Sequence, residues 1–118
     1  RRLDEPQRGP APCPRRHASI VAYGGGLWVF GGFSEDDKVL SDLWVLSLDT
    51  MRWRRLPDDI RPVSDSALGA TDEQQRLHPP ARAEHTAVVF ESTMIVFGGY
   101  CGRRKMNDSW AFDFKTLK

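Results

Sequence analysis

The chain has 118 residues, of which 40% are hydrophobic and 28% are charged, and its formal net charge is +1. These values are typical of one soluble globular domain or of a piece of a larger one. The near-neutral charge excludes a general attraction to nucleic acid or to an anionic membrane surface. No apolar run approaches the roughly 18 residues of a membrane span.

The N-terminal extension, residues 1–13, is polar and rich in proline. It has no signal-peptide pattern and no initial methionine, so we expect a piece of a cytoplasmic protein. Cys13 and Cys101 are too few for a disulfide scaffold or a four-ligand zinc site. We expect two free thiols in a reducing compartment. A Cys13–Cys101 disulfide, which would imply secretion, stays open as the alternative.

Residues 14–57 have the pattern of four short strands. Apolar segments rich in Val, Leu, Phe and Trp are bounded by glycine, aspartate and serine, which favour turns. Gly24-Gly25-Gly26 marks the first turn, residues 34–38 form a polar loop, and Asp49-Thr50 marks the last turn. The strands are expected over residues 17–23, 27–32, 42–48 and 52–56.

The following segment, residues 58–79, is acidic. Between Pro57 and Pro80 the chain carries five acids and two arginines. Two interpretations stay open: a disordered excursion, or a loop that orders against a partner and forms a short helix over residues 66–77.

Residues 80–118 repeat the first unit. LWVFGGF (27–33) matches MIVFGGY (94–100), and SDLW (41–44) matches NDSW (107–110). The offset is 68 at the histidines (85 − 17), 67 at the glycines (98 − 31) and 66 at the tryptophans (110 − 44). This drift indicates two copies of one unit whose loops differ slightly in length.

The first two strands of each unit are apolar at consecutive positions. Strands in a sheet that is covered on both faces have this pattern. Four-stranded sheets stacked about an axis bury both faces of each sheet. The sequence therefore predicts stacked antiparallel sheets.

The order R-x-x-H, apolar strand, F-G-G, (N/S)-D-x-W and W-x-x-L resembles the kelch motif of β-propellers. The resemblance implies an all-β, kelch-type β-propeller segment of two four-stranded blades, the second incomplete, within a larger propeller. Blade one spans residues 14–57, the acidic inter-blade insertion 58–79, and blade two 80–118. The motif positions with an expected structural role are His17, Gly31, Gly32, Trp44, Trp53, His85, Gly98, Gly99 and Trp110.

Two features depart from the motif. The arginines of the first unit, Arg15 and Arg16, precede His17 by two residues and one residue instead of three. The unit spacing of 66–68 also exceeds the roughly 50 residues of a kelch repeat.

Each glycine pair is expected where the second strand passes close to its neighbours, because glycine removes the side chain and permits positive φ. Phe30 and Phe97 would then fill the space between blades, and the tryptophans of the third and fourth strands would pack against the adjacent sheet. Asn107-Asp108-Ser109 fits a glycosylation acceptor, but we favour a turn that leads into the third strand.

We expect no catalytic site, metal or cofactor. His17 and His85 occupy matched positions and are interpreted as structural, and no cysteine or carboxylate lies at ligand spacing from them. Some kelch-like propellers are copper radical oxidases. Their chemistry needs Tyr and His ligands and a Tyr–Cys cross-link. Tyr100 and Cys101 are neighbours in the sequence, but no set of histidine ligands accompanies them.

The resemblance implies a protein-interaction scaffold that presents loops to another protein, and it also implies further kelch blades as packing partners. Cytoskeletal or ciliary association stays open, as does a non-catalytic propeller within a larger enzyme such as a phosphatase. The candidate contacts lie in the loop between the second and third strands of each unit: Phe33, Ser34, Glu35, Asp36, Asp37, Lys38, Tyr100, Arg103, Arg104 and Lys105.

Overall fold

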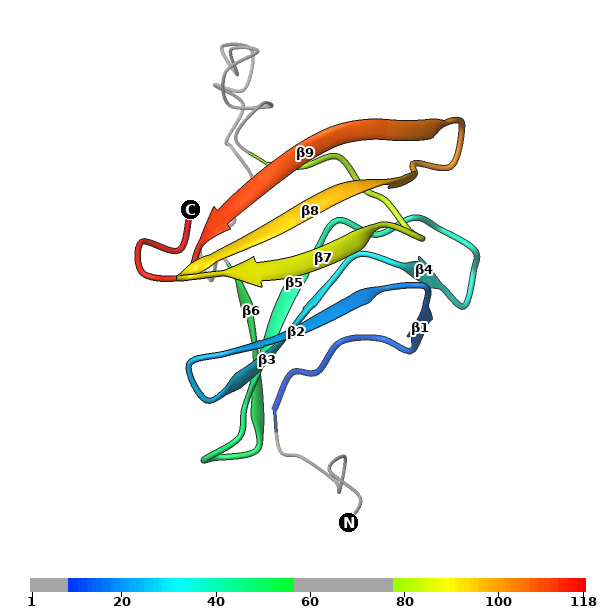
Figure 1. Cartoon of the computed structure of the whole chain (residues 1–118). Coiled ribbons are helices and arrows are strands. Elements are labelled where there is room, and N and C mark those ends of the chain that lie inside the picture. The colour runs from blue at the N-terminus through cyan, green and yellow to red at the C-terminus, as the bar shows by residue number, and fades with distance from the viewer. Residues whose placement is uncertain (1–8, 57–77) are drawn as a thin grey trace, which may run out of the picture.

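The computed structural model describes residues 9–56 and 78–118, which form nine strands and no helix (Figure 1). Most of the acidic insertion, including the helix expected over residues 66–77, and the start of the N-terminal extension lie outside these residues.

The first sheet contains four antiparallel strands in the order β2-β3-β5-β6. The predicted strands are confirmed, with ends that differ by one or two residues at β2, β3 and β5. The tight turn at residues 24–25 joins β2 to β3, and the turn over residues 48–51 joins β5 to β6. The bounds are β2 (Ser19–Tyr23), β3 (Gly26–Phe30), β5 (Leu43–Ser47) and β6 (Arg52–Leu56).

The second sheet contains three antiparallel strands in the order β7-β8-β9, with an irregular register between Phe97 and Gly99. Asn107 and Asp108 lie within a strand and not in the expected turn. A short pair, β1 with β4, flanks the first sheet. The bounds are β7 (Thr86–Phe90), β8 (Thr93–Tyr100), β9 (Lys105–Asp113), β1 (Arg15–Arg16) and β4 (Phe33–Ser34).

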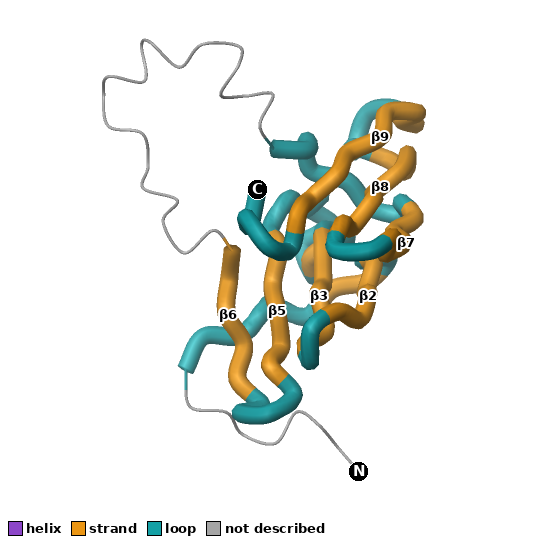
Figure 2. Tube along the Cα trace, turned by 60° about the vertical axis from the view of Figure 1, so that its left-hand side comes forward, coloured by secondary structure: helices purple, strands orange, loops and turns teal. Residues whose placement is uncertain are grey.

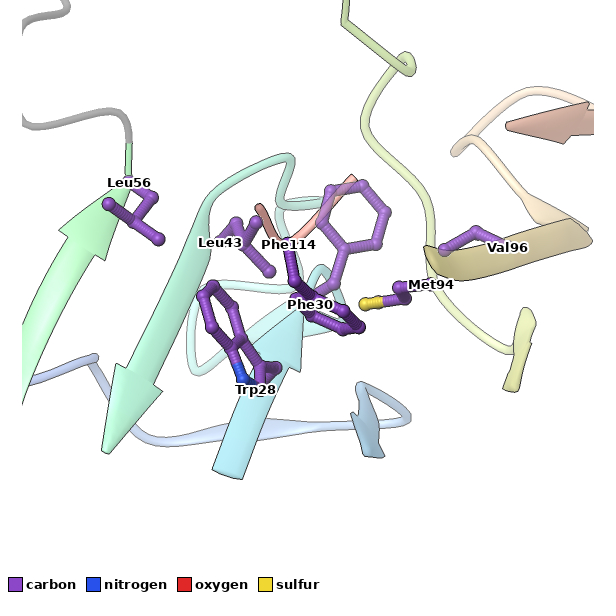
Figure 3. Packing of buried hydrophobic residues seen from close by; sticks show 7 residues of the cluster. All are labelled: Trp28, Phe30, Leu43, Leu56, Met94, Val96 and Phe114. Atoms are coloured by element: carbon purple, nitrogen blue, oxygen red, sulfur yellow. The ribbon is translucent and has the colours of Figure 1, made fainter. Parts of the chain in front are cut away.

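The two sheets pack face to face and enclose one apolar core (Figures 2 and 3). Tyr23 stacks on Phe114 with ring centroids 4.2 Å apart, and Trp28 lies 4.7 Å from the same ring. Burying large aromatic and aliphatic side chains in this way is the main stabilising contribution. The buried members of the core are Trp28, Phe30, Leu43, Leu56, Met94, Val96 and Phe114.

The outer face of the second sheet carries the residues that correspond to the face of the first sheet packed between the two sheets. Val88, Phe90 and Phe97 are 58%, 65% and 51% exposed, and at an offset of 67 they correspond to Val21, Tyr23 and Phe30. Phe30 therefore fills the space between the sheets, as expected, whereas Phe97 does not contact a second described sheet. Within the described chain, each sheet covers only one face of the other.

The predicted equivalence of His17 and His85 is wrong. β2 begins at Ser19 and β7 at Thr86, so the offset is 67 and His85 corresponds to Ala18. His17 instead corresponds to Glu84, and both have positive φ, 58° and 60°. The residue types matched, but the backbone positions do not.

Candidate partner-binding surface

The first glycine pair lies where the backbones of the two units meet. Gly31 has φ 68°, and a Cβ there would lie 2.5 Å from the carbonyl oxygen of Arg82. The Gly32 N–H donates to the same oxygen at 2.9 Å. A side chain at Gly31 would push the backbone away from that of Arg82. Glycine is therefore needed at this position, where β3 ends and the chain turns.

A buried ion pair fixes the ends of that loop. Arg15 donates to both carboxylate oxygens of Asp42 at 2.6 and 2.9 Å and to the carbonyl of Gly31 at 3.1 Å. The indole N–H of Trp44 donates to Asp42 at 2.8 Å. Burial acts to raise the pKa of Asp42, but the hydrogen bonds from Arg15 and Trp44 outweigh it, and the pKa lies below its ordinary value.

The second unit repeats this arrangement. Arg82, which is fully buried, donates to both oxygens of Asp108 at 2.8 Å and to the carbonyl of Gly98 at 3.0 Å. Trp110 donates its indole N–H to Asp108 at 2.7 Å. The hydrogen bonds from Arg82 hold the pKa of Asp108 far below the ordinary carboxyl range. Arg15 and Arg82 occupy matched positions in the two units. The arginine spacing of the first unit differed from the motif only because it was counted from His17, which is not equivalent to His85.

A histidine joins the two sheets beside these ion pairs. The Nε2 of His85 lies 2.7 Å from the Oγ of Ser19, and the His85 ring meets Phe30 edge-on at 5.3 Å. His85 is 8% exposed. Burial, together with the positive charge of Arg82, lowers the pKa of His85 to about 4. His85 is therefore neutral near pH 7 and packs between the two sheets.

The loop that joins β4 to β5 folds on itself. The Ser34 N–H donates to the Lys38 carbonyl at 2.9 Å, and the Asp37 N–H donates to the Ser34 carbonyl at 3.0 Å. Asp37 has φ 59°, which closes the turn. Glu35, Asp36, Asp37 and Lys38 are all exposed, so this rigid turn presents three acids and one lysine.

The β8–β9 loop is similarly short and carries the opposite charge. Tyr100 pairs with Lys105 across the sheet, and the Cys101 N–H donates to the carbonyl of Arg104 at 3.1 Å. Hydrogen bonds from the backbone N–H groups of Arg103 and Arg104 lower the pKa of the Cys101 thiol. Arg103, Arg104 and Lys105 are exposed.

The two loops meet at one end of the molecule, on the right in Figure 1. The rings of Phe33 and Tyr100 lie 6.2 Å apart. A Cβ on Gly102 would lie 3.1 Å from Val39, so the loops also touch beside these rings. We refer to residues 33–38 and 100–105 together as the loop surface. The structure thus brings every predicted contact residue to one end of the molecule.

Sequence reasoning missed Arg16 and assigned His17 only a motif role, although both contact the loop surface. The Arg16 guanidinium lies 4.9 Å from the Phe33 ring centroid and binds Asp37 at 2.6 Å, and His17 meets Phe33 edge-on at 6.2 Å. Only the pairing of β1 with β4 reveals these contacts. An adjoining cavity of about 210 Å³ is lined by Pro14, Arg15, Arg16, Phe33, Ser34 and Glu35.

The predicted motif tryptophans have different environments. Trp44 is buried, whereas Trp53 on β6 and Trp110 on β9 are half-buried. Cys13 and Cys101 are free thiols. In residues 9–56 and 78–118 no three His, Cys, Asp or Glu side chains gather as a metal site would require. The same residues contain no helix that could span a membrane.

Comparison with known proteins gives consistent matches. A sequence model of the KLHDC2/KLHL20/DRC7 Kelch-repeats domain matches residues 3–118. Host cell factor 2 from Homo sapiens is 31% identical over 95% of this chain and 14% of its own length. The leucine-zipper-like transcriptional regulator 1 homolog from Drosophila melanogaster is 28% identical over 89% of this chain and 10% of its own length.

Tip elongation aberrant protein 3 from Schizosaccharomyces pombe is 27% identical over 93% of this chain and 11% of its own length. The chain therefore spans at most 14% of the length of these three relatives.

Proposed function

The chain belongs to the kelch-repeat family, and from this we propose that its loop surface binds a partner protein. Kelch repeat domains typically form protein-binding propellers, in which stacked sheets hold loops in fixed positions. Binding residues commonly lie on loops that a rigid scaffold positions.

The observation that carries the proposal is the contact between the two loops. Phe33 and Tyr100 come from different units, yet their rings lie 6.2 Å apart at one end of the molecule. Aromatic side chains with exposed edges, flanked by charges, are typical of the centre of a protein interface. The ion pairs Arg15–Asp42 and Arg82–Asp108, whose arginine side chains are buried, hold the chain on both sides of each loop, so we expect little conformational entropy to be lost on binding.

The charge pattern indicates the kind of partner. Glu35 and Asp36 form an acidic area beside a basic area of Arg103 and Arg104, with the aromatic rings of Phe33 and Tyr100 in the same surface. A partner with a matching basic and acidic surface would be oriented by both areas.

Charge reversal tests the surface directly. We expect a variant with Glu35→Lys, Asp36→Lys, Arg103→Glu and Arg104→Glu to lose specific partners when the tagged full-length protein is isolated and its bound proteins are quantified. A matched control, Asp49→Lys with Lys115→Glu, changes exposed charges outside the loop surface and should retain those partners. Equal recovery with both variants would show that the loop surface is not the interface.

We also propose that the chain itself catalyses no reaction and acts in an intracellular protein. Tyr100 and Cys101 offer a check, since a propeller oxidase of the copper radical type would depend on a cross-linked tyrosine and cysteine and these two residues are the candidates in this chain. We expect Tyr100→Phe and Cys101→Ser to leave any enzymatic activity of the intact protein unchanged, and loss of activity in either variant would contradict this proposal.

A further inference from the structure

β6 forms one margin of the first sheet (Figure 2). Among the described residues it pairs only with β5, over all five of its residues. An edge strand in an antiparallel sheet leaves the N–H and C=O groups of alternate residues unpaired on its outer side. The margin of the first sheet can therefore accept another extended segment.

β6 differs in charge from the other edge strands of the two large sheets, β2-β3-β5-β6 and β7-β8-β9. Its sequence, RWRRL, contains three arginines and no acid, and all three arginines are exposed. The edge strands β2 (SIVAY) and β7 (TAVVF) contain no charged residue, and β9 contains both signs. Among the edges of these two sheets, positive charge is thus concentrated on β6.

The arginines project from both faces of the sheet. Arg52 pairs with Ser47 and therefore shares its face, whereas Arg55 lies on the opposite face beside Trp44. Neither Arg52 nor Arg55 forms an ion pair within residues 9–56 and 78–118. A strand laid along β6 would thus meet available guanidinium groups above and below the sheet plane.

We propose that the β6 edge binds an extended acidic segment of a partner protein by strand addition. The unpaired backbone groups of β6 supply directional hydrogen bonds, and the arginines select acidic side chains on both faces of the added strand. Repulsion between like charges opposes the same pairing between two copies of this edge. A nucleic acid could use the arginines but not the strand-forming backbone groups.

The test uses the full-length protein and a fluorescent peptide of alternating glutamate and valine, about eight residues long, which is enough to span an edge strand. Fluorescence anisotropy measures its dissociation constant. We expect Arg52→Gln with Arg55→Gln to weaken binding about tenfold or more, and Arg103→Gln with Arg104→Gln in the loop surface to leave it within about twofold. Equal melting temperatures for the two variants would confirm that both are folded.

Two further probes separate strand addition from charge attraction alone. A peptide of alternating glutamate and proline has the same charge but cannot pair as a strand, so we expect it to bind at least about tenfold more weakly. We also expect the glutamate–valine peptide to slow amide hydrogen exchange within residues 52–56. Equal binding of the two peptides, unchanged exchange, or binding of single-stranded DNA in place of the glutamate–valine peptide would each overturn the proposal.

Discussion

At the scale of single residues, burial distinguishes two ion pairs of the same chemical type. The side chains of Arg15 and Asp42 are 7% and 15% exposed, whereas those of Arg16 and Asp37 are 55% and 71% exposed. Loss of one charge leaves a buried partner uncompensated in the first pair, but leaves a solvated partner in the second.

The two pairs therefore give a matched stability comparison. We expect Asp42→Asn to lower the free energy of unfolding by about 3–5 kcal/mol and Asp37→Asn to lower it by about 1 kcal/mol or less. Chemical denaturation of the intact protein measures both. A cost for Asp37→Asn as large as that for Asp42→Asn would contradict the role assigned to burial.

The glycines give a second comparison at this scale. Gly31→Val should lower the melting temperature far more than Gly25→Val. Both positions have positive φ, but only at Gly31 would the new Cβ meet backbone, 2.5 Å from the carbonyl oxygen of Arg82. Equal melting temperatures for the two variants would show that the close approach of the units does not limit stability.

Residue type alone was a poor guide to equivalence between the units. The glycine and tryptophan matches were correct: the matched glycines share positive φ, and each indole N–H donates to the aspartate two residues before it. The histidine match was wrong, since Ala18 and His85 share one backbone position while His17 shares another with Glu84. Only the folded structure shows that Asp42 and Asp108 bind arginines that lie more than twenty residues away in the sequence.

At the scale of the elements, most of the architecture could be predicted. The pattern of short apolar segments between turn residues correctly predicted all four strands of the first sheet. The third strand of the second sheet was placed less well, because Asn107 and Asp108 favour turns locally, yet pairing with β8 and the ion pair with Arg82 hold them in β9. Tertiary contacts overrode local preference there.

The hydrogen bond between His85 and Ser19 links the two sheets and makes this contact sensitive to pH. The pKa of His85 is about 4 in the folded protein and about 6.5 when unfolded. Between these values the unfolded chain binds more protons, so the free energy of unfolding should fall as the pH is lowered from about 6.5 towards 4. Denaturation midpoints across this range measure the fall.

His85→Ala places the residue of the first unit, alanine, at the matched position and removes the titrating group. We expect this variant to show a weaker pH dependence between about 4 and 6.5, although its stability at pH 7 will be lower. The lowered pKa values of Asp42 and Asp108 act at more acidic pH, where protonation removes their stabilising contribution. An unchanged slope in His85→Ala would exclude His85 as the source.

At the scale of the whole molecule, the outer face of the second sheet exposes three large apolar side chains. Val88, Phe90 and Phe97 repeat positions that the first sheet buries partly (Val21 and Tyr23) or fully (Phe30). Exposed apolar areas of this kind normally mark a packing interface. We infer that a further kelch sheet covers this face in the intact protein.

Introducing a charge on this face tests whether another sheet covers it. We expect Phe97→Lys to lower the melting temperature of the intact protein by several degrees or more, because a buried lysine would lack a partner. Thr116→Lys, at an exposed position beyond β9, should change it little. Similar melting temperatures for wild type and Phe97→Lys would show that the face is open to water.

The repeated arginine–aspartate pairs also make the intervening loops suitable for engineering. Each pair fastens the chain on both sides of a loop, at Gly31 and Asp42 in one unit and, within β8 and β9, at Gly98 and Asp108 in the other. Insertions between these anchors need not shift the strands on either side. Evolution could therefore recombine loops of different length on one unchanged framework, and a designer could graft foreign recognition sequences between the same anchors.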